Sequence, residues 1–454
     1  MDTVIPSAVF YAISGVLVLG VLIGLSLMSK PKTARAGNAL GAACAVTAII
    51  VTMYNYSVLT APVIFASIAM GVIISLFIVF KVKMIQMPQL VALLNGFGGL
   101  SSALVAVLSY SQAESRFSSV SSTVALIIGF ITFTGSLIAA GKLHKVLPQK
   151  PVVIKGHTVI VLLLTAAVIA CAACGLPVWV TALLSCLFGI AFAVRVGGAD
   201  MPITISLLNS LSGVAGGIAG IAVGDIMLVA IGGIVGASGL LLTQIMCKAM
   251  NRKLLGILLG STPAKTAVAE NSENEPAEED PAAREKIALA PEEILKDAKK
   301  VIIIPGYGMA LAQAQSKVKA LADKLEEKGA EVKFAIHPVA GRMPGHMNVL
   351  LCEVDVPYDK LHEIETINPE FAECDAVIVV GANDVINPAA NTAEGTPIYG
   401  MPVLDAAAAK AVIICNFDEK PGYAGVPNPL YKSDNTLLLL GDAKETVSKL
   451  IDCI

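Results

Sequence analysis

Charged residues are scarce in this sequence. Only 15% of its 454 residues are Asp, Glu, Lys or Arg, and the formal net charge is −3. Without an excess of Lys and Arg the chain has no basic face, so we expect no nucleic-acid partner. Hydrophobic residues make up 55% of the sequence, and the mean hydropathy is +0.75. Soluble proteins of this length do not have such a composition, which predicts that much of the chain lies in a lipid bilayer.

A disulfide or zinc framework is also missing. The nine cysteines follow no spacing typical of either, and we expect no metal site. Cys171 and Cys174 form a Cys-x-x-Cys pair inside an apolar run, where two small packing side chains are the better interpretation. The N-terminus has Asp2 and no basic segment before its first apolar run, which predicts a membrane helix rather than a cleaved signal peptide.

Long apolar runs fill the first half of the chain. A helix of about 20 apolar residues spans the hydrocarbon core of a bilayer. Several of the runs are rich in Gly, Ala and Ser, which permits close packing of helices. Nine runs are predicted as membrane helices, namely 7–28, 37–53, 60–80, 88–110, 120–141, 158–174, 176–196, 203–221 and 226–247.

Positive charges alternate between the loops that join these runs. Loops after even-numbered spans have almost none, Arg116 being the exception. Loops after odd-numbered spans carry Lys30, Lys32, Arg35, Lys81, Lys83, Lys142, Lys145, Lys150, Lys155, Arg195, Lys248, Arg252 and Lys253. Because Lys and Arg concentrate in cytoplasmic loops, the pattern predicts a multi-pass protein with its N-terminus outside and everything after the ninth span in the cytoplasm.

Polar residues within the spans are costly in lipid, so they are candidates for function. Asp200, at the mouth of the seventh and eighth spans, either caps a helix at the membrane interface or takes part in the function. Asn209 and Asn95 lie deeper, and each either forms an interhelical hydrogen bond or has a functional role. His144 and His157 fall in a basic loop and are expected to be solvated.

Composition changes sharply after the ninth span. Residues 261–290 are rich in Ala, Pro, Glu and Asn, which cannot bury a core and indicates a flexible acidic tether. We therefore divide the chain into a transmembrane domain at 1–255, a linker at 256–290 and a soluble domain at 291–454, which begins with a short helix over 291–300.

The stretch 301–337 organises the soluble domain. Its apolar run 301–304 predicts a buried strand, 309–328 has helical apolar spacing, and 332–336 predicts the next strand. Gly306, Tyr307 and Gly308 form the turn between strand and helix, where bare N–H groups at a helix N-terminus suit a pyrophosphate. The pattern is incomplete, since Leu311 replaces a third glycine and His337 stands where an acid usually ends the second strand. A glycine turn in a ligand-free domain is the alternative.

Three further apolar runs, 376–380, 411–415 and 436–440, predict more strands. Strands that alternate with helices favour a Rossmann-like, doubly wound parallel α/β sheet. Ligands bind beyond the carboxyl ends of such strands, and the glycine-rich segments here all follow strands, so we expect them to meet at one crevice. Arg342, in the loop after the second strand, either contacts a phosphate there or is a surface residue.

With these segments in view, nearly the whole chain resembles the β subunit of proton-translocating nicotinamide nucleotide transhydrogenase. The motifs that carry the resemblance are GGADMP (197–202), MCKAMNR (246–252), PGYGMALAQAQ (305–315), HPVAGRMPGHMNVLL (337–351), GANDVINPAA (381–390), GMPVL (400–404), GYAGVPNPL (422–430) and GDAK (441–444). So many long motifs in one order are highly specific. The family implies a coenzyme bound in the reverse orientation to that of usual Rossmann domains, which would explain the missing acid.

The resemblance also implies roles for individual residues. Asp384 would couple the state of the nucleotide to protonation, and Asp200 and Asn209 match positions on or near the proton path. The implied dinucleotide contacts, beside Gly306 and Gly308, are Tyr307, Val339, Ala340, Gly341, Arg342, Met343, Pro344, Gly381, Ala382, Asn383, Asp384, Val385, Gly400, Met401, Gly422, Tyr423, Asp442 and Ala443.

Two departures from the family pattern matter. Many members carry a histidine, the presumed proton carrier, where this chain has Asn95, and asparagine does not titrate near neutral pH. The titrating group is then expected elsewhere, for example on a membrane helix of a partner subunit. The family usually has Lys-Arg-Ser for the 2′-phosphate of NADP(H), where this chain has Asn416-Phe417-Asp418. Asp418 would repel a phosphate, which leaves Lys420 and Arg342 as nearby cations.

The resemblance thus predicts one subunit of a redox-driven proton pump in a bacterial inner membrane. Hydride would pass between NAD(H) on a separate α subunit and NADP(H) bound here, and a β–β dimer within an α2β2-type complex is expected. Because the nicotinamides carry the chemistry, no protein nucleophile is needed. The alternatives are NAD(H) in this site, or a channel or transporter gated by a nucleotide.

Overall fold

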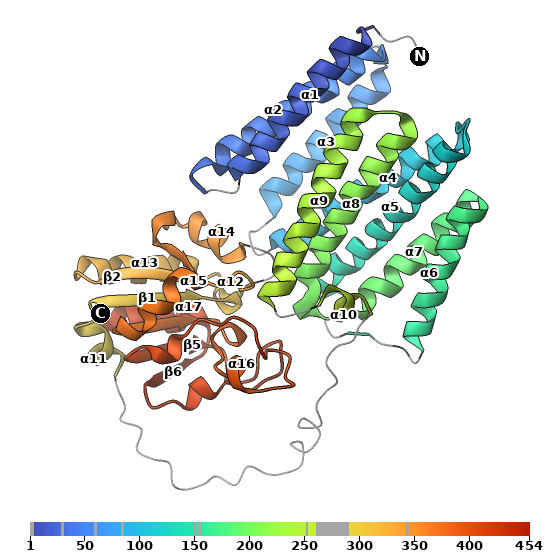
Figure 1. Cartoon of the computed structure of the whole chain (residues 1–454). Helices are drawn as coiled ribbons and strands as arrows, with labels where there is room; N and C mark the ends of the chain where they lie inside the picture. Colours follow the sequence, from blue (N-terminus) through green and yellow to red (C-terminus); the bar gives the residue numbers. More distant parts are fainter. Residues whose placement is uncertain are drawn as a thin grey trace. The chain divides into compact units, whose positions relative to one another are not determined.

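The computed structural model describes residues 4–28, 31–58, 61–82, 86–148, 151–152, 154, 156–250, 253–259, 290–341 and 345–454. The chain divides into two compact units. Most of the long helices belong to one unit and the whole β-sheet to the other, and the two are described in turn (Figure 1).

Nine helices in the described part of the chain are long and apolar enough to cross a membrane, as predicted. Their ends lie a few residues beyond most of the predicted apolar runs, since helices continue into the headgroup region. The chain is therefore a multi-pass membrane protein. The helices are α1 Ser7–Met28, α2 Pro31–Asn55, α3 Pro62–Lys81, α4 Met87–Ser111, α5 Arg116–Leu143, α6 His157–Cys174, α7 Val178–Arg195, α8 Met201–Val223 and α9 Ile226–Ala249.

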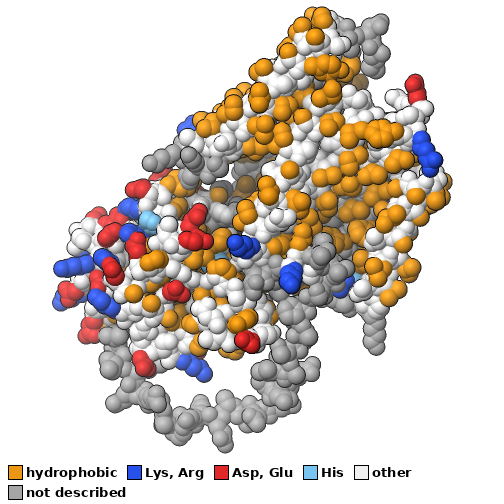
Figure 2. Space-filling view, viewed as in Figure 1, with side chains coloured by type: hydrophobic (Ala, Val, Ile, Leu, Met, Phe, Trp, Pro, Cys, Tyr) orange, Lys and Arg blue, Asp and Glu red, His pale blue; other side chains and the backbone are white. Residues whose placement is uncertain are grey.

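Small residues let these helices approach closely, as the composition predicts. Between α4 and α5, a Cβ atom added at Gly99 would lie 2.8 Å from the Thr132 Cβ and 2.9 Å from the Gly129 carbonyl oxygen. Such contacts replace the hydrophobic driving force, which is weak between helices in lipid. Hydrophobic side chains cover much of the visible helix surface in Figure 2, whereas charged side chains gather over the sheet unit.

The second unit is built on a six-stranded, all-parallel sheet with the order β3-β2-β1-β4-β5-β6. From β1 the chain adds β2 and β3 on one side and then β4, β5 and β6 on the other side. The strand order therefore reverses between β1 and β4, which is the topological switch point. The strands are β1 Lys300–Pro305, β2 Glu331–Ile336, β3 Leu361–Glu363, β4 Ala376–Val380, β5 Ala411–Asn416 and β6 Thr436–Leu440. The predicted doubly wound parallel sheet is confirmed.

Helices cover both faces of this sheet. On one face, α13 Gln315–Glu327 packs against α17 Ala443–Cys453 and against strand β2. On the other face, alternate strand residues such as Ile304, Val379 and Ile414 form one core with residues of α15 Ile364–Ile367 and η5 Asn368–Glu373. The central strands β1, β4 and β5 are therefore buried on both sides, which explains why they read as continuous apolar runs.

The single helix predicted over 309–328 is wrong, because it is broken in two. Helix α12 covers Tyr307–Ala312 and α13 begins at Gln315. Gln313 between them adopts a left-handed conformation with φ of 53°. The break turns Leu311 out of the helical apolar stripe, and its side chain is 55% exposed. Apolar spacing continues across the break, so periodicity alone could not locate it.

Two smaller elements also differ from expectation. Strand β3 was not predicted, because a three-residue edge strand has too few residues to show a pattern. The entry helix expected over 291–300 ends earlier, as α11 Pro291–Lys296. Most of the predicted linker lies outside the described residues, and a short helix, α10 Leu254–Leu259, overlaps its first residues.

Candidate functional site

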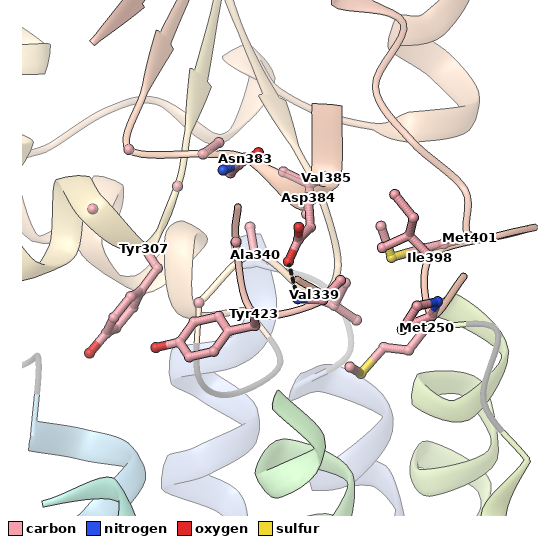
Figure 3. Close-up of a pocket in the computed structure, with 18 of the residues that line it drawn as sticks. Met250, Tyr307, Val339, Ala340, Asn383, Asp384, Val385, Ile398, Met401 and Tyr423 are labelled. Atoms are coloured by element: carbon pink, nitrogen blue, oxygen red, sulfur yellow. Dashed lines mark hydrogen bonds between the residues drawn. The ribbon is translucent and has the colours of Figure 1, made fainter. Parts of the chain in front are cut away.

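A cavity lies beyond the carboxyl ends of β1 and β4, at the switch point (Figure 3). Parallel sheets of this topology bind ligands at this place because the loops on either side of the switch point diverge. Figure 3 shows Tyr307 and Tyr423 on one side of Asp384, and Ile398 and Met401 on the other. The lining residues from the sheet domain are Gly306, Tyr307, Gly308, Val339, Ala340, Gly341, Gly381, Ala382, Asn383, Asp384, Val385, Pro397, Ile398, Met401, Gly422, Tyr423 and Ala424.

Three glycines hold the loops after β1 and β4 in direct backbone contact. The Gly306 amide donates to the Val380 carbonyl at 2.8 Å, and the Gly308 amide donates to the Gly381 carbonyl at 2.8 Å. A Cβ atom at Gly308 would lie 2.6 Å from the Gly381 Cα atom. The expectation that both turn amides are bare is therefore wrong. The glycines serve close approach of two loops, and helix α12 has only 6 residues, which limits its dipole.

Replacement of Gly381 by Ala is expected to lower the free energy of unfolding of the domain by about 2–5 kcal/mol. Gly381 has φ of +68°, and a Cβ atom there would lie 2.5 Å from the Gly308 carbonyl carbon. The left-handed backbone costs an alanine about 1–2 kcal/mol, and overpacking adds about 1–3 kcal/mol.

Gly395 is the matched control, since its φ is +80° and nothing lies within 4 Å of an added Cβ. Gly395→Ala should cost only the backbone term, about 1–2 kcal/mol. Denaturant unfolding of both variants measures the difference, and equal losses would refute the close-contact account.

Asp384 is the one buried carboxylate that lines the described part of the cavity. One of its oxygens, Oδ2, accepts from the Ala424 amide at 3.0 Å, while Oδ1 has no hydrogen-bond partner among the described residues. A Cβ atom at Gly422 would lie 2.5 Å from Oδ1, so this glycine leaves room for the carboxylate. Burial raises the pKa of Asp384 above its ordinary value, and hydrogen bonds from the amides of Ala424 and Tyr423 partly oppose this.

The raised pKa predicts how Asp384→Asn changes stability with pH. In the folded domain the charged carboxylate is penalised at neutral pH, and the penalty disappears as pH falls through the raised pKa. Asparagine keeps an acceptor for Ala424 and carries no charge. The variant should therefore have a higher unfolding temperature than wild type at neutral pH, with the difference shrinking as the medium is acidified.

Thermal unfolding across this pH range, with exposed Asp434→Asn as the control, measures this difference. An Asp384→Asn effect that stays constant with pH would show that charge burial is not its cause.

Asparagine side chains fasten the loops after β4 and β5 to each other. Asn383 Nδ2 donates to the Lys420 carbonyl at 3.0 Å, and Asn428 Nδ2 donates to the Asn383 carbonyl at 3.3 Å. Asn387 Nδ2 donates to the Pro427 carbonyl at 3.2 Å. These side chains satisfy loop carbonyls that no strand partner can reach. The wall of the cavity is thereby held to the sheet.

His337 holds the loop after β2 in place. It stands at the position where an acidic residue usually ends the second strand, and its own role was not predicted. Its Nε2–H donates to the Pro402 carbonyl at 2.8 Å, and its Nδ1 accepts from the Val339 amide at 3.2 Å. Burial lowers its pKa to about 4, so the ring is neutral at physiological pH. His337 thus positions Val339 at the cavity. Arg342, Met343 and Pro344, which follow in this loop, lie outside the described residues.

The segment after β5 carries an acidic group where the family resemblance implies cations. Asn416 is buried, and its Nδ2 donates to the Ala382 carbonyl at 2.8 Å and to the Tyr431 hydroxyl at 2.7 Å. Asp418 Oδ1 accepts from the Lys420 amide at 3.1 Å, and Asp418 Oδ2 lies 3.4 Å from Lys420 Nζ. The Asn416 amide is therefore used inside the domain, and Lys420 is partly neutralised by Asp418.

The structure brings most of the predicted dinucleotide residues to one cavity, and separates others from it. Gly400, Asn416, Asp418, Lys420, Asp442 and Ala443 do not line it. Asp442 caps helix α17 by accepting from the Lys444 amide at 2.9 Å. Sequence reasoning missed Pro397, Ile398 and Ala424 as lining residues. Ala424 could have been predicted, because it follows Gly422 and Tyr423 in the same motif. Pro397 and Ile398 lie in no motif, so the sequence does not indicate them as lining residues.

The polar candidates in the membrane helices have different surroundings. Asn95 is 7% exposed, and its Nδ2 donates to Ser136 Oγ at 3.1 Å across α4 and α5, which is the interhelical bond considered above. Asn209 in α8 is exposed. Asp200 ends η3 Gly198–Asp200, and its carbonyl accepts from Thr204 Oγ1 at 3.1 Å, so it precedes the first turn of α8.

His157, which was expected to be solvated, is buried, so that expectation is wrong, and the loop cation Lys142 is buried as well. His157 begins helix α6 and is 4% exposed, and Lys142 lies in the last turn of α5 and is 1% exposed. Charge in the sequence could not distinguish a free loop cation from one that caps a neighbouring helix. His144 is exposed, as predicted.

Fold and site together define a class: a multi-pass membrane protein that carries a doubly wound α/β domain with a dinucleotide-type crevice. The profile of the NAD(P) transhydrogenase beta subunit family matches residues 8–453. The chain is 41% identical over 460 residues to the NAD(P) transhydrogenase subunit beta of Rhodospirillum rubrum, covering 98% of each chain. The subunit of the same name from a defined strain of that species matches equally. The chain belongs to the NAD(P) transhydrogenase beta subunit family, whose role is proton-coupled hydride transfer.

Proposed function

We propose that the crevice binds NADP(H), and that hydride passes between it and NAD(H) held on a separate α subunit. The observation that carries this proposal is the buried Asp384 carboxylate at the switch-point cavity, where it holds the wall segment that contains Ala424. The nicotinamide, when bound, supplies the hydride chemistry, and no protein nucleophile is required.

The residues present fit such a coenzyme. The glycine contact between Gly306, Gly308 and Gly381 leaves the cavity floor without side chains, which permits close approach of a ligand. The rings of Tyr307 and Tyr423 have centroids 6.4 Å apart at 54°, which gives the cavity an aromatic side. Such a pair can orient a planar ring while contributing no reactive group.

Asp384 is proposed to couple protonation to the state of the site. Its carboxylate accepts from the Ala424 amide, so protonation at Oδ2 would remove that acceptor and loosen the segment 422–424. Because burial already raises its pKa, a modest change in its surroundings is enough to change its charge. The wall of the cavity would thereby respond to a proton.

Proton access is proposed to run past Asp200 and Asn209, with the titrating carrier on a partner subunit. Asn95 cannot titrate, and it is engaged with Ser136. Asn209 is exposed on α8, where an amide against lipid would be costly. A membrane helix of the α subunit that covers this face would remove the cost. Acidification of vesicles by the chain alone would contradict the proposal.

The arrangement in the cell follows from the loop charges. We propose an outside N-terminus and a cytoplasmic C-terminal domain in a bacterial inner membrane, with a transmembrane domain at 1–255, a linker at 256–290 and the coenzyme domain at 291–454. A β–β dimer within an α2β2-type complex is proposed as the assembly. Protease digestion of right-side-out vesicles that removes the C-terminal domain would overturn this orientation.

Expression of residues 290–454 alone tests the coenzyme site. The domain has its own two-sided core, so we expect it to fold, stay soluble and bind a nicotinamide dinucleotide. Titration of the domain with NADPH and NADH, followed by fluorescence or calorimetry, measures binding. A folded domain that binds neither coenzyme would refute the proposed site.

A further inference from the structure

Three ring-bearing side chains lie next to one another at the tyrosine side of the cavity. The ring centroids of Tyr307 and Tyr423 are 6.4 Å apart (Figure 3), and those of Tyr307 and His346 are 6.5 Å apart with 46° between the planes. Both tyrosines line the cavity, whereas His346 is 0% exposed and does not line it. Tyr307 therefore has one aromatic neighbour at the cavity and a second one buried inside the sheet domain.

Helix α14, which covers His346–Glu353, fixes the place of this histidine because His346 is its first residue. The helix packs against α12 and α13, and its Leu350 and Leu351 side chains are buried. Its last residue, Glu353, accepts a hydrogen bond at Oε2 from Gln315 Nε2 of α13, at 3.2 Å. A buried ring in a close-packed interior has little freedom to move, so His346 gives Tyr307 a firm neighbour.

The loop after β2 leaves the space that the histidine ring occupies. Gly341 has φ of +104°, and a Cβ atom there would lie 2.4 Å from His346 Nδ1 and 2.8 Å from His346 Cγ. A side chain at Gly341 would have to displace the ring, which overpacking makes unfavourable. Because Gly341 also lines the cavity, the backbone of the cavity wall lies directly against His346.

The ring beside Tyr307 limits the orientations that the tyrosine can adopt. Tyr307 is only partly buried and is the first residue of α12, immediately after the glycine turn. With empty space in place of the histidine, the tyrosine could change its rotamer and turn away from the cavity. A tilted aromatic pair favours one arrangement by about two- to tenfold, so the loss of His346 should be measurable at the cavity.

We propose that His346 is a positioning residue for the coenzyme, because its ring holds Tyr307 in the orientation in which the tyrosine contacts a nicotinamide dinucleotide in the cavity. The inference rests on the coenzyme site proposed above. His346 reaches no ligand itself, and it acts by direct packing on a residue that does. The ring, rather than the nitrogen atoms, is what the site requires of this residue.

The test uses the full chain, purified in detergent without its α subunit, so that only the site proposed here is titrated. Calorimetry with NADPH measures the dissociation constant. His346→Ala should weaken binding by about fivefold, within the range that an aromatic pair contributes. When Tyr307→Ala is already present, adding His346→Ala should weaken binding by less than about twofold, because the ring that it positions has been removed.

Two further substitutions separate the ring from the nitrogen atoms. His346→Phe keeps a ring beside Tyr307 and should bind NADPH within about twofold of wild type. His346→Gln keeps an N–H donor without a ring, and it should bind as weakly as His346→Ala. If His346→Phe does not fold, the comparison in the Tyr307→Ala background decides alone.

Leu325→Ala is the control for a loss of packing without a loss of positioning. Leu325 is 1% exposed and lies in the last turn of α13, which leads to the start of β2 at the edge of the sheet opposite the cavity. The substitution should lower the unfolding temperature. Its affinity for NADPH, measured on the folded protein, should equal that of wild type.

Three results would overturn the inference and leave the coenzyme site intact. They are wild-type affinity in His346→Ala, a full fivefold loss from His346→Ala in the Tyr307→Ala background, and wild-type affinity in His346→Gln together with weak binding in His346→Phe. A wild-type chain that binds neither NADPH nor NADH would instead overturn the proposed coenzyme site, and this inference with it.

Discussion

Asp418→Lys is expected to raise the preference of the coenzyme site for NADP(H) over NAD(H) by about a hundredfold, because each charge-assisted hydrogen bond to a phosphate contributes about 1.5–3 kcal/mol. The family resemblance places the adenosine 2′-position at residues 416–418. In wild type the Asp418 carboxylate would repel a 2′-phosphate, while it can accept a hydrogen bond from a free 2′-hydroxyl. The wild-type chain should therefore discriminate weakly between the two coenzymes, or prefer NAD(H).

The structure makes a rearrangement of this segment unfavourable. Asn416 is held by Ala382 and Tyr431, and Lys420 is engaged with Asp418 through its amide and its ammonium group. Lys420 is 83% exposed, so it could turn toward a phosphate only by leaving Asp418. NADP(H) remains the proposed ligand because the motifs around the cavity resemble those of the family, but its advantage is expected to be small.

Competitive titration with NADPH and NADH decides the question. Asp418→Asn keeps the acceptor for the Lys420 amide and removes the charge, and should shift the preference by about tenfold toward NADP(H). Glu419→Lys changes the net charge as much as Asp418→Lys does, at the neighbouring exposed residue, and should have a much smaller effect. If the wild-type chain binds NADP(H) a hundredfold or more tighter than NAD(H), weak discrimination is refuted. A preference of about that size is what a pair of cations on the 2′-phosphate would provide. Lys420→Ala and Arg342→Ala would then show which cation is responsible.

Asp200→Asn is expected to reduce proton-linked transhydrogenation by at least about tenfold without preventing insertion into the membrane. A carboxyl group beside a membrane helix costs free energy, and the fold does not need it, so we expect it to have a function. Asparagine has nearly the same size but carries no negative charge. Coenzyme binding to the sheet domain should be unchanged, since the substitution leaves that fold intact.

Asp225 provides the matched control at the other end of α8. Its Oδ1 accepts from the Met227 amide at 2.9 Å and from the Leu228 amide at 3.1 Å, which caps helix α9. Asparagine also caps helices well, so Asp225→Asn should leave activity and coupling near wild type. Both variants are compared in vesicles that contain the α subunit, by coenzyme reduction and by proton uptake. Normal pumping in Asp200→Asn would eliminate this residue from the proton path.

The sequence by itself determined the elements whose signal is local. Nine membrane spans were readable because about 20 apolar residues suffice to cross lipid whatever surrounds them. The strands at 376–380 and 436–440 were predicted to the residue, because each is an apolar run bounded by turn residues. Strand 376–380 is buried on both faces, as expected for a central parallel strand. The glycine-rich turns follow the strands, and because the carboxyl ends of parallel strands lie at one edge of a sheet, these turns indicated where that edge is.

Only the tertiary structure decided which groups meet. The turn amides of Gly306 and Gly308 bond across to β4 and its loop, and the chain breaks at Gln313 although its apolar spacing continues. Lys142 reads as a loop charge and His157 as a solvated loop residue, yet both are buried and bond to carbonyls near the end of α7. A sequence pattern records the polarity of a residue and its spacing along one element. The partner of a buried donor lies far away in the sequence, so the free energy that selects it is set by packing in three dimensions.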